Sequence, residues 1–369
     1  MKSYAQRFSE NLRRLRQSLN LTQRELAEAV KYSEKTVSKW ETNASVPEIG
    51  TLFTIASVLH TDIEGLFRDD DESWLLGIDG GGTKTALALA DSTGNIVRTL
   101  KTDCCNPIDI GLDASRNILS DAIYELCRGI PLSQVTLYAG IAGGTSGDMK
   151  KQLAEFFESF GFDSFDNGSD NMNIITAGLG DGDGVSLILG TGICAWAKRG
   201  GDIKRIAGWG YLIDDGGSAY NIGRDALVAY YRAYDGSGEP TLLTEYINKA
   251  SISPERLLGD IYSGGKKTIA GYSQLVFRAA DAGDRVSEAI LERNFSFAAR
   301  IIETAAKDFD SSKRLKVVLA GGLTEQPTLL PRLRAVLRDA DNYDLHILDC
   351  EPVLGALSCA VKLRDRRKK

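Results

Sequence analysis

Three glycine-rich turns, each directly after an apolar run, are the parts of this sequence best suited to bind phosphate. They read DGGGTKT at 79–85, GTG at 190–192 and AGG at 320–322. Glycines let backbone N–H groups approach a phosphate closely, and the first turn adds hydroxyls and one positive charge. Each turn alone could be a plain β-turn, but three of them after three apolar runs favour a nucleotide. The residues expected at the phosphates are Asp79, Gly81, Gly82, Thr83, Lys84, Thr85, Gly190, Thr191, Gly192, Gly321 and Gly322.

One carboxylate adds chemistry to these turns. Asp79 could hold a magnesium ion through water, because hard cations prefer oxygen ligands. Asp170 follows another expected strand, and the plain interpretation of an Asp there is that it caps the helix beginning at Asn171. A further segment, GGKKT at 264–268, has the wrong spacing for a Walker A loop, and we expect a surface turn there.

The chain is long enough for at least two domains, whose strands and helices must position these residues. The chain has 369 residues, and its 43% hydrophobic and 25% charged residues are typical of a globular protein. It has only two His, and its six Cys form no C-x-x-C pair, which argues against His-based metal sites, a Ser-His-Asp triad and zinc ribbons. The N-terminus lacks a signal-peptide pattern, and the apolar runs are too short to span a membrane, so we expect a cytoplasmic location.

The first 68 residues differ from the rest in charge and in glycine content. They carry a net charge of +2, whereas the remainder carries −8 and most of the 38 glycines. Helical spacing of apolar residues predicts five short helices. Thr22 with Glu25 forms a capping box, and Ser33 caps the next helix. Helix, tight turn and helix over 22–40 fit a helix-turn-helix, whose second helix could enter a DNA major groove.

This head resembles the lambda-repressor/Cro type (XRE family) of helix-turn-helix. The residues that carry the resemblance are LTQRELA, the SEKTVSKWE helix and the P-x-x-x-x-L-x-x-I-A-x-x-L continuation. The resemblance implies that the head binds a double-stranded DNA operator, although the same polar residues could be only a solvated helix face. The residues it implies at the DNA are Gln23, Glu34, Lys35, Thr36, Ser38 and Lys39.

The body resembles the actin/hexokinase/Hsp70 ATPase superfamily through the order of its glycine turns. Within it, the body is similar to N-acetylglucosamine kinase and the BadF/BadG ATPases, over 74 to about 363. The resemblance implies ATP and Mg²⁺ as cofactors, an amino sugar as the small-molecule partner and a two-lobed α/β, ribonuclease H-like fold. It implies sugar contacts by Asn106, Gly143, Gly144, Asp170 and Asp215, with Asp170 as catalytic base.

Three positions depart from the family pattern. Ile193 stands where Ser is usual, Asp214 where Gly is usual, and Gly216 where Glu is usual. The loss of a hydroxyl at 193 could slow turnover. Two functions therefore stay open: a DNA-binding regulator fused to an ATP-dependent N-acetylhexosamine kinase, or a transcriptional regulator whose kinase fold senses amino sugar, sugar phosphate or ATP. An acyl-CoA-linked ATPase is disfavoured by Asn106 and Asp215.

The domain organisation expected from these patterns is an all-α five-helix head followed by the two lobes. We expect the DNA-binding domain at 1–68 and an acidic linker at 69–73. Lobe I is expected at 74–184 plus 350–369 and lobe II, which binds nucleotide, at 185–349. The resemblance of the head also implies a homodimer. Because the linker is short, we expect sugar binding to change operator affinity.

Overall fold

The computed structural model describes residues 3–67, 73–250 and 253–367. The chain divides into two compact units, Met1–Asn173 with Pro352–Lys369, and Ile174–Glu351. The lobe boundaries at 184 and 350 stay predictions, and all but Ser73 of the predicted linker lies outside the described residues. Among the described residues, no helix is both long and apolar enough to cross a lipid bilayer.

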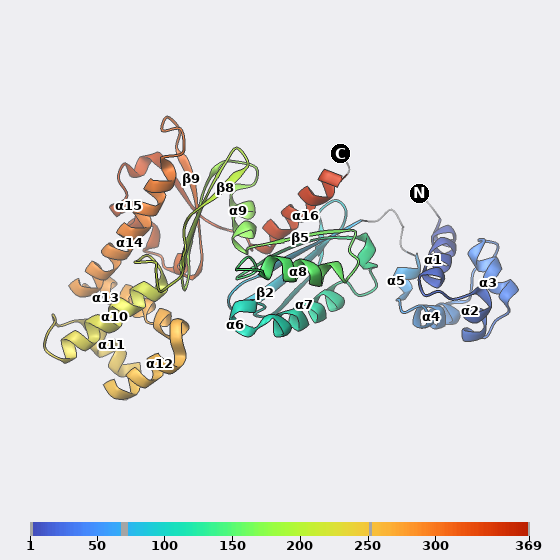
Figure 1. The fold of residues 1–369 in the computed structure, drawn as a ribbon, viewed down its shortest axis with the longest axis horizontal. Helices are drawn as coiled ribbons and strands as arrows, with labels where there is room; N and C mark the ends of the chain where they lie inside the picture. Colours follow the sequence, from blue (N-terminus) through green and yellow to red (C-terminus); the bar gives the residue numbers. More distant parts are fainter. Residues whose placement is uncertain (1–2, 68–72, 251–252, 368–369) are drawn as a thin grey trace. The chain divides into compact units, whose positions relative to one another are not determined.

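The head has the five predicted helices around a core of its own (Figure 1). They are α1 (Tyr4–Ser18), α2 (Gln23–Ala29), α3 (Glu34–Glu41), α4 (Ile49–Val58) and α5 (Ile63–Phe67). The capping box of Thr22 and Glu25 and the cap by Ser33 are both present, as predicted. These caps satisfy helix N–H groups that would otherwise lack partners, which fixes where α2 and α3 begin.

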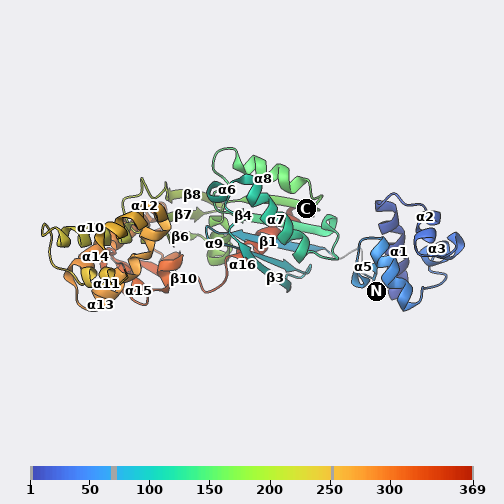
Figure 2. The ribbon, with the colours of Figure 1, turned by 90° about the horizontal axis from the view of Figure 1, so that it is seen from below.

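The α/β part of the first unit is built on a five-stranded sheet in the order β3-β2-β1-β4-β5 (Figure 2). The strands are β1 (Trp74–Gly80), β2 (Lys84–Ala90), β3 (Ile96–Asp103), β4 (Val135–Ile141) and β5 (Ser164–Gly168). The first three are antiparallel neighbours, whereas β4 and β5 run parallel to β1. The carboxyl ends of β1, β4 and β5 therefore lie at the same end of the sheet, together with the carboxyl end of β3.

Helices cover both faces of this sheet. One face packs against α7 (Leu112–Leu126) and α8 (Met149–Glu158), with α6 (Pro107–Ile110) before them. The other face packs against α16 (Val353–Arg367). This helix comes so close to β1 that a Cβ on Gly77 would lie 2.6 Å from the backbone nitrogen of Leu357. The C-terminal helix thus returns to the first unit, as the sequence predicts.

The second unit repeats the same sheet topology in the order β10-β9-β6-β7-β8. Its strands are β6 (Gly184–Leu189), β7 (Ile193–Arg199), β8 (Asp202–Ala207), β9 (Leu315–Ala320) and β10 (Tyr343–Ile347). Again three strands form an antiparallel meander, and β9 and β10 run parallel to the first of them. Each glycine turn predicted at a phosphate follows a buried strand: β1, β6 or β9.

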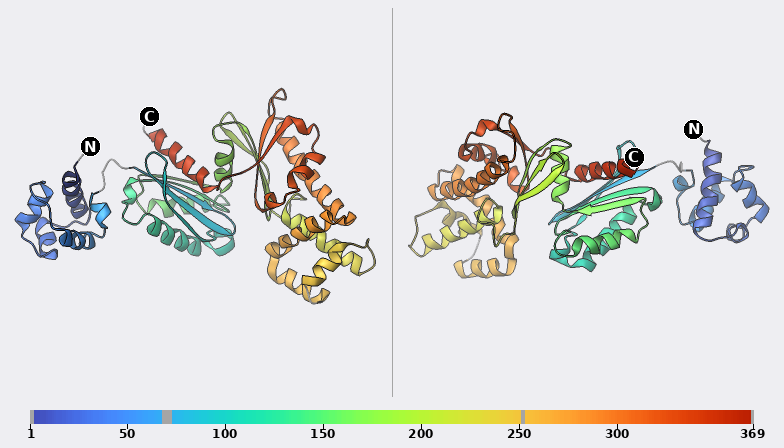
Figure 3. Two further views of the ribbon diagram at one scale, coloured as in Figure 1. Left: turned by 180° about the vertical axis from the view of Figure 1, so that it is seen from behind. Right: turned by 45° about the horizontal axis from the view of Figure 1, so that its top comes forward.

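Most of the remaining helices belong to the second unit (Figure 3). They are α9 (Asn171–Leu179), α10 (Ala219–Tyr234), α11 (Leu242–Ala250), α12 (Pro254–Gly271), α13 (Ser273–Asp281), α14 (Arg285–Ala306) and α15 (Leu329–Val336). The surface turn expected at 264–268 is wrong, because this segment lies inside α12. The helix is kinked within this segment, because Gly265 has the non-helical angles φ 60° and ψ −151°.

Candidate active site and DNA-binding surface

The end of β1 carries Asp79 and leads into the first glycine turn. The turn is closed by the Gly81 N–H, which donates to the Lys84 carbonyl at 3.0 Å. Thr83 and Lys84 are exposed. Thr85 is buried, and its hydroxyl donates to the carbonyl of Asp103 at 2.7 Å. The turn thus exposes backbone groups, the Thr83 hydroxyl and the Lys84 ammonium group. The Thr85 side chain instead links β2 to β3.

Asn173 ties this turn to the start of α9. Its Nδ2 donates to Asp79 Oδ1 at 2.7 Å, to the Gly140 carbonyl at 3.1 Å and to the Ile78 carbonyl at 3.3 Å. A Cβ on Gly140 would overlap the Asn173 amide, so glycine is required there. The Asn173 N–H also donates to the Asp170 carbonyl at 3.0 Å. Asn173 therefore links Asp170 and Asp79 at the same end of the sheet, where the carboxyl ends of β1 and β5 lie.

Asp170, predicted as the catalytic base, is half-buried directly before α9. Burial raises the pKa of its carboxyl, while the Ser169 hydroxyl and the Asn171 N–H act in the opposite direction. Both groups donate to Oδ1 at 3.0 Å, and the Asn171 amide reaches the same atom. All three of these hydrogen bonds end on Oδ1.

Asn106 and Gly143, both predicted at the sugar, are in contact. Asn106 caps α6, with its Oδ1 accepting from the Ile108 N–H at 3.0 Å and its Nδ2 donating to Asp109 at 2.9 Å. Gly143 has φ +72°, and a Cβ there would overlap Asn106 Oδ1. Gly144 follows in the same turn. This group adjoins the first glycine turn, because a Cβ on Gly80 would lie 2.6 Å from the sulfur of Cys105.

In the second unit, the other two glycine turns lie against each other. Gly321 has φ +97°, and a Cβ there would be 2.6 Å from the Leu189 carbonyl oxygen and 2.9 Å from the Gly190 nitrogen. The first turn of α10 closes over the same place, since the Ala219 N–H donates to the Gly190 carbonyl at 2.9 Å. Within the described residues, and apart from each glycine and its chain neighbours, no heavy atom lies within 4 Å of a Cβ built on Gly192 or Gly322. The two turns thus form a backbone-lined surface that side chains leave open.

Asp214, where the family usually has Gly, holds the loop between β8 and α10. Its carboxylate is buried and accepts from the N–H groups of Trp209 at 3.2 Å and Gly210 at 2.9 Å. Its carbonyl accepts from the Asn221 amide at 3.1 Å. Asp215, the predicted sugar ligand, is exposed on this loop. Adjacent carboxylates therefore have different surroundings: one is fixed inside the loop and the other faces solvent.

The other two departures, Ile193 and Gly216, each pack at this loop, near Gly217 and Phe297 respectively. A Cβ on Gly217 would lie 2.7 Å from Ile193 Cδ1, and one on Gly216 would lie 3.0 Å from Phe297 Cβ on α14. The Gly217 N–H donates to Asn294 Oδ1 at 2.9 Å. The larger residue at 193 and the small residues that follow Asp215 thus share one tightly packed space.

The head presents a helix-turn-helix face made by α2 and α3. On α3, Glu34, Lys35 and Lys39 are exposed, and Thr36 and Ser38 are half-buried. Val37 and Trp40 are buried in the core. These burial values agree with the interpretation that one side of α3 packs inward while the other can meet DNA.

Gln23 has a second role that the sequence does not indicate. Its amide donates to Glu41 Oε2 at 2.8 Å, and Glu41 also receives Arg16 in a two-pronged ion pair of 2.5 and 2.9 Å. Burial alone would raise the pKa of Glu41, but the bonds from Arg16 and Gln23 outweigh it, and the pKa is lowered. Gln23 is thereby held at the start of α2.

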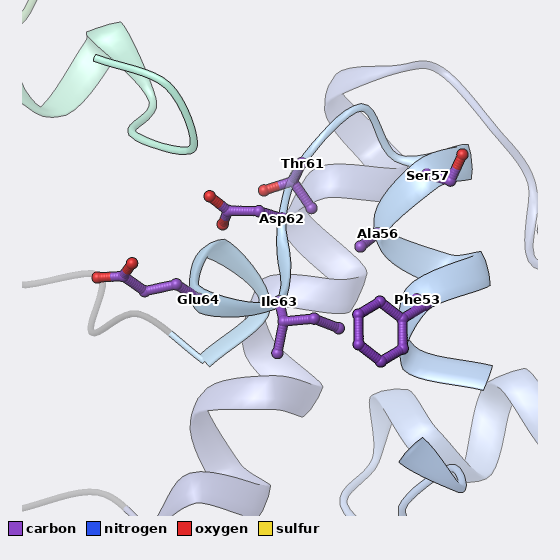
Figure 4. A pocket seen from close by; sticks show the side chains of 7 residues that line it. All are labelled: Phe53, Ala56, Ser57, Thr61, Asp62, Ile63 and Glu64. Carbon is purple, nitrogen blue, oxygen red and sulfur yellow. The ribbon is translucent and has the colours of Figure 1, made fainter. Parts of the chain in front are cut away.

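A groove lies between α4 and α5, and none of the predicted DNA-contacting residues lines it (Figure 4). Its volume is about 540 Å³, and it is lined by Phe53, Ala56, Ser57, Thr61, Asp62, Ile63 and Glu64. In Figure 4 the Phe53 ring lies beside Ile63, and the carboxylates of Asp62 and Glu64 extend away from them. An apolar floor with acidic edges is unsuited to nucleic acid.

Together the fold and the site define a helix-turn-helix domain fused to a two-sheet α/β kinase-like domain. The sequence matches the BadF/BadG/BcrA/BcrD ATPase family over residues 76–360 and a helix-turn-helix family over 12–66. The chain belongs to the BadF/BadG/BcrA/BcrD ATPase family, with the helix-turn-helix at its N-terminus. The predicted families and the predicted fold class are confirmed.

The relatives are sugar kinases. N-acetyl-D-glucosamine kinase of Dictyostelium discoideum is 27% identical over 309 residues, which cover 78% of this chain and 97% of the relative. N-acetylmuramic acid/N-acetylglucosamine kinase of Clostridium acetobutylicum is 30% identical over 264 residues, covering 68% and 85%. A crystal structure of a proposed N-acetylglucosamine kinase from Chromobacterium violaceum has a TM-score of 0.64 at 24% identity, over 78% of this chain and 99% of that one. The last likeness shows the shared fold.

Proposed function

We propose that this protein phosphorylates an N-acetylated amino sugar with ATP and binds an operator through its head. The observation that carries the kinase proposal is the contact set of Asn173, which fixes Asp170 beside Asp79 at the end of β1. Asp170 has a raised pKa, and the hydrogen bonds that it accepts end on Oδ1, so in this proposal Oδ2 takes the proton of the substrate hydroxyl. The relatives named as N-acetylglucosamine kinases support the choice of sugar.

In this proposal each group of residues does one part of the work. Asn106, Gly143, Gly144 and Asp215 hold sugar hydroxyls, and Asp170 accepts the proton of the attacking hydroxyl. The turn at Gly81 to Lys84 and the paired turns at Gly190 and Gly321 bind phosphate oxygens through backbone N–H groups. The open space at Gly192 and Gly322, which a side chain would fill, fits such a ligand.

MgATP, when bound, supplies the phosphoryl group and offsets its negative charge. No group of three or more His, Cys, Asp or Glu side chains in the described ranges is placed to form a metal site. Asp79 is the carboxylate that would hold magnesium through water, as the ion usually keeps several waters and binds through substrate phosphates.

The second candidate function is a sensor that binds sugar and ATP with little turnover. Ile193 favours it, because a buried aliphatic side chain replaces a hydroxyl directly after the turn at 190–192. Both functions place the protein with DNA and ATP in the cytoplasm.

Phosphorylation of a panel of amino sugars and plain hexoses separates the two candidates. We expect turnover of one N-acetyl sugar that is lost in Asp170→Asn. The matched control is Asp166→Asn, which changes an exposed carboxylate on β5 of the same sheet and should leave the rate unchanged. Absence of turnover with a sugar-induced rise in Tm would favour the sensor, and absence of both would reject an amino-sugar site.

For the head, we propose transcription regulation as a homodimer that joins through α4. Ile49 and Phe53, four residues apart on this helix, are 75% and 63% exposed, and Val46 just before it is 58% exposed. Exposed apolar side chains at this spacing form a stripe that a second copy can cover. Phe53→Ser should shift the protein to monomer in sedimentation and weaken operator binding, whereas Thr54→Ser on the same helix should change neither. A monomeric wild-type protein would refute the dimer.

Sugar and nucleotide should also change operator affinity, because two heads must meet half-sites about 34 Å apart and small shifts in spacing matter. An operator affinity unchanged by saturating sugar and ATP would refute this coupling while leaving the kinase proposal intact.

A further inference from the structure

A pocket of about 630 Å³ lies in the second unit between α10, the kinked α12 and the loop before α10. It is lined by Tyr211, Leu212, Tyr220, Arg224, Leu227, Val228, Tyr231, Arg232, Asp235, Leu258, Ile261, Tyr262, Gly265, Lys266 and Ile269. Its size is in the range of small-molecule sites, which are mostly apolar with a few polar groups. None of these residues is among those assigned to sugar, phosphate or DNA above.

The lining combines apolar surface with positive charge. Tyrosine rings and branched aliphatic side chains make up most of it, and Leu212 and Tyr262 are 80% and 83% exposed. The lining holds Arg224, Arg232 and Lys266 and one acid, Asp235, and Arg224 also pairs with the neighbouring Asp225 at 3.2 Å. Large exposed apolar side chains gathered at one place mark binding sites, and the excess of cations selects an anion.

The walls of the pocket are continuous with two segments of the proposed active site. Tyr211 belongs to the loop that carries Asp215, and its ring meets the Tyr220 ring at 4.9 Å in an edge contact. The Tyr220 N–H donates to the Thr191 carbonyl at 3.2 Å, in the glycine turn after β6. A molecule in the pocket would therefore contact the loop and the helix end that hold both segments in place.

We propose that this pocket is a regulatory site for a small amphipathic anion, meaning an apolar or aromatic body that carries a carboxylate, sulfonate or phosphate. The body lies on the tyrosine and aliphatic surface, with cation–π and stacking contacts available from the rings. The acidic group pairs with Lys266 and Arg232. Occupation stabilises one arrangement of the Tyr211 loop and thereby changes affinity at the sugar and nucleotide sites.

Binding of anilinonaphthalene sulfonate, a fluorescent aromatic anion, tests this site without any requirement for kinase activity. We expect saturable binding of one molecule per chain. Lys266→Gln and Arg232→Gln should each weaken it about fivefold, the loss expected for one exposed charge contact. The uncharged N-phenylnaphthylamine should bind these variants as it binds the wild type, because only the charge contact is removed.

Matched controls lie beside the pocket on the same two helices. Lys267→Gln and Tyr234→Ser change exposed residues that do not line it and should leave binding unchanged, whereas Tyr262→Ser should weaken both probes. All five variants should keep the wild-type Tm, since the side chains concerned are exposed or half-buried.

Three results would overturn the proposal. One is equal binding of the sulfonate by Lys266→Gln and Lys267→Gln. Another is full displacement of the probe by ATP, which would make the pocket part of the nucleotide site. The third is a dimer that Tyr262→Ser dissociates, which would make the surface an interface between two copies. None of them would bear on whether Asp170 acts as a base.

Discussion

Replacing Asn173 by Asp tests whether its amide holds the two carboxylates of the site in place. The substitution changes one NH₂ group to oxygen and leaves the shape of the side chain intact. It puts a second carboxylate 2.7 Å from Asp79 Oδ1, in a place where Asn173 is fully buried. Two unit charges at that distance repel by about 6 kcal/mol at an effective dielectric constant of about 20.

The repulsion raises the pKa of the introduced carboxyl well above its unfolded value, so the folded variant keeps a proton there. The folded state then binds more protons than the unfolded state, and stability falls as pH rises. At about pH 5 the protonated group can still donate to Asp79, and we expect a loss of about 1–2 kcal/mol in the free energy of unfolding. At about pH 8 the loss should grow to about 5–6 kcal/mol, because stability falls by about 1.4 kcal/mol for each pH unit over which the folded variant keeps a proton that the unfolded chain has lost.

The assay is denaturant unfolding of wild type and variant between these two pH values, with sugar phosphorylation measured beside it. Asn95→Asp is the matched control, because Asn95 also donates to a carboxylate, that of Asp91, but in an exposed turn. Solvent screens the Asn95–Asp91 pair, so Asn95→Asp should change the free energy of unfolding by no more than about 0.5 kcal/mol at every pH. If the free energy of unfolding that Asn173→Asp loses does not change with pH, the reasoning is refuted.

Other predictions follow from the same contacts. The phosphorylation rate should fall as pH drops through the raised pKa of Asp170, because only the carboxylate can accept a proton; a rate insensitive to acid would contradict this role. Glu41→Gln should destabilise the head by about 3 kcal/mol in hydrogen exchange of α1 to α3, since the buried Arg16 loses its counter-charge. Because the pKa of Glu41 is lowered in the folded state, its contribution in the wild type is present above an unfolded pKa of about 4.3 and is lost as pH falls through the folded value. Gly217→Ala should lower stability by about 1–3 kcal/mol because of its φ of +82° and its contact with Ile193; adding Ile193→Ala should cost less than the two separate losses predict, and full additivity would show that the two do not share space.

The sequence was sufficient for the positions of the glycine turns and of the head helices. Both depend on local patterns: an apolar strand followed by glycines, and a cap with its partner three residues later. GGKKT at 264–268 shows the limit of such patterns. Its glycines suggest a turn, but flanking helix-forming residues extend α12 through them, and the preference of glycine is met by a kink at Gly265.

The residues that hold the site in place could not be found in this way. Asn173 donates to acceptors 95, 94 and 33 residues away in the chain, so no local spacing reveals it. Asp214 and Asp215 are adjacent and chemically identical, and only the fold shows that the first is enclosed by its own loop. A weak signal existed at Asn294, an amide inside an otherwise apolar face of α14, because buried amides need partners.

The departures from the family pattern are distributed in a way that bears on the choice between kinase and sensor. Asp79, Asn106 and Asp170 belong to the first unit, and their hydrogen bonds to Asn173, Ile108 and Ser169 are all in place.

All three departures belong to the second unit. Ile193 on β7 packs against Gly217, and Gly216 packs against α14. Asp214 accepts hydrogen bonds within the loop that contains both glycines. Substitutions confined to one packed cluster should alter what that cluster contacts, which is the glycine turn at 190–192 and the loop of Asp215. The sugar contacts of Asn106, Gly143 and Gly144 and deprotonation by Asp170, which all belong to the first unit, should therefore persist even where phosphoryl transfer is slow. Ile193→Ser, which restores the hydroxyl, should then raise turnover without changing the affinity for sugar, whereas a change in sugar affinity alone would place the effect of Ile193 at the sugar loop.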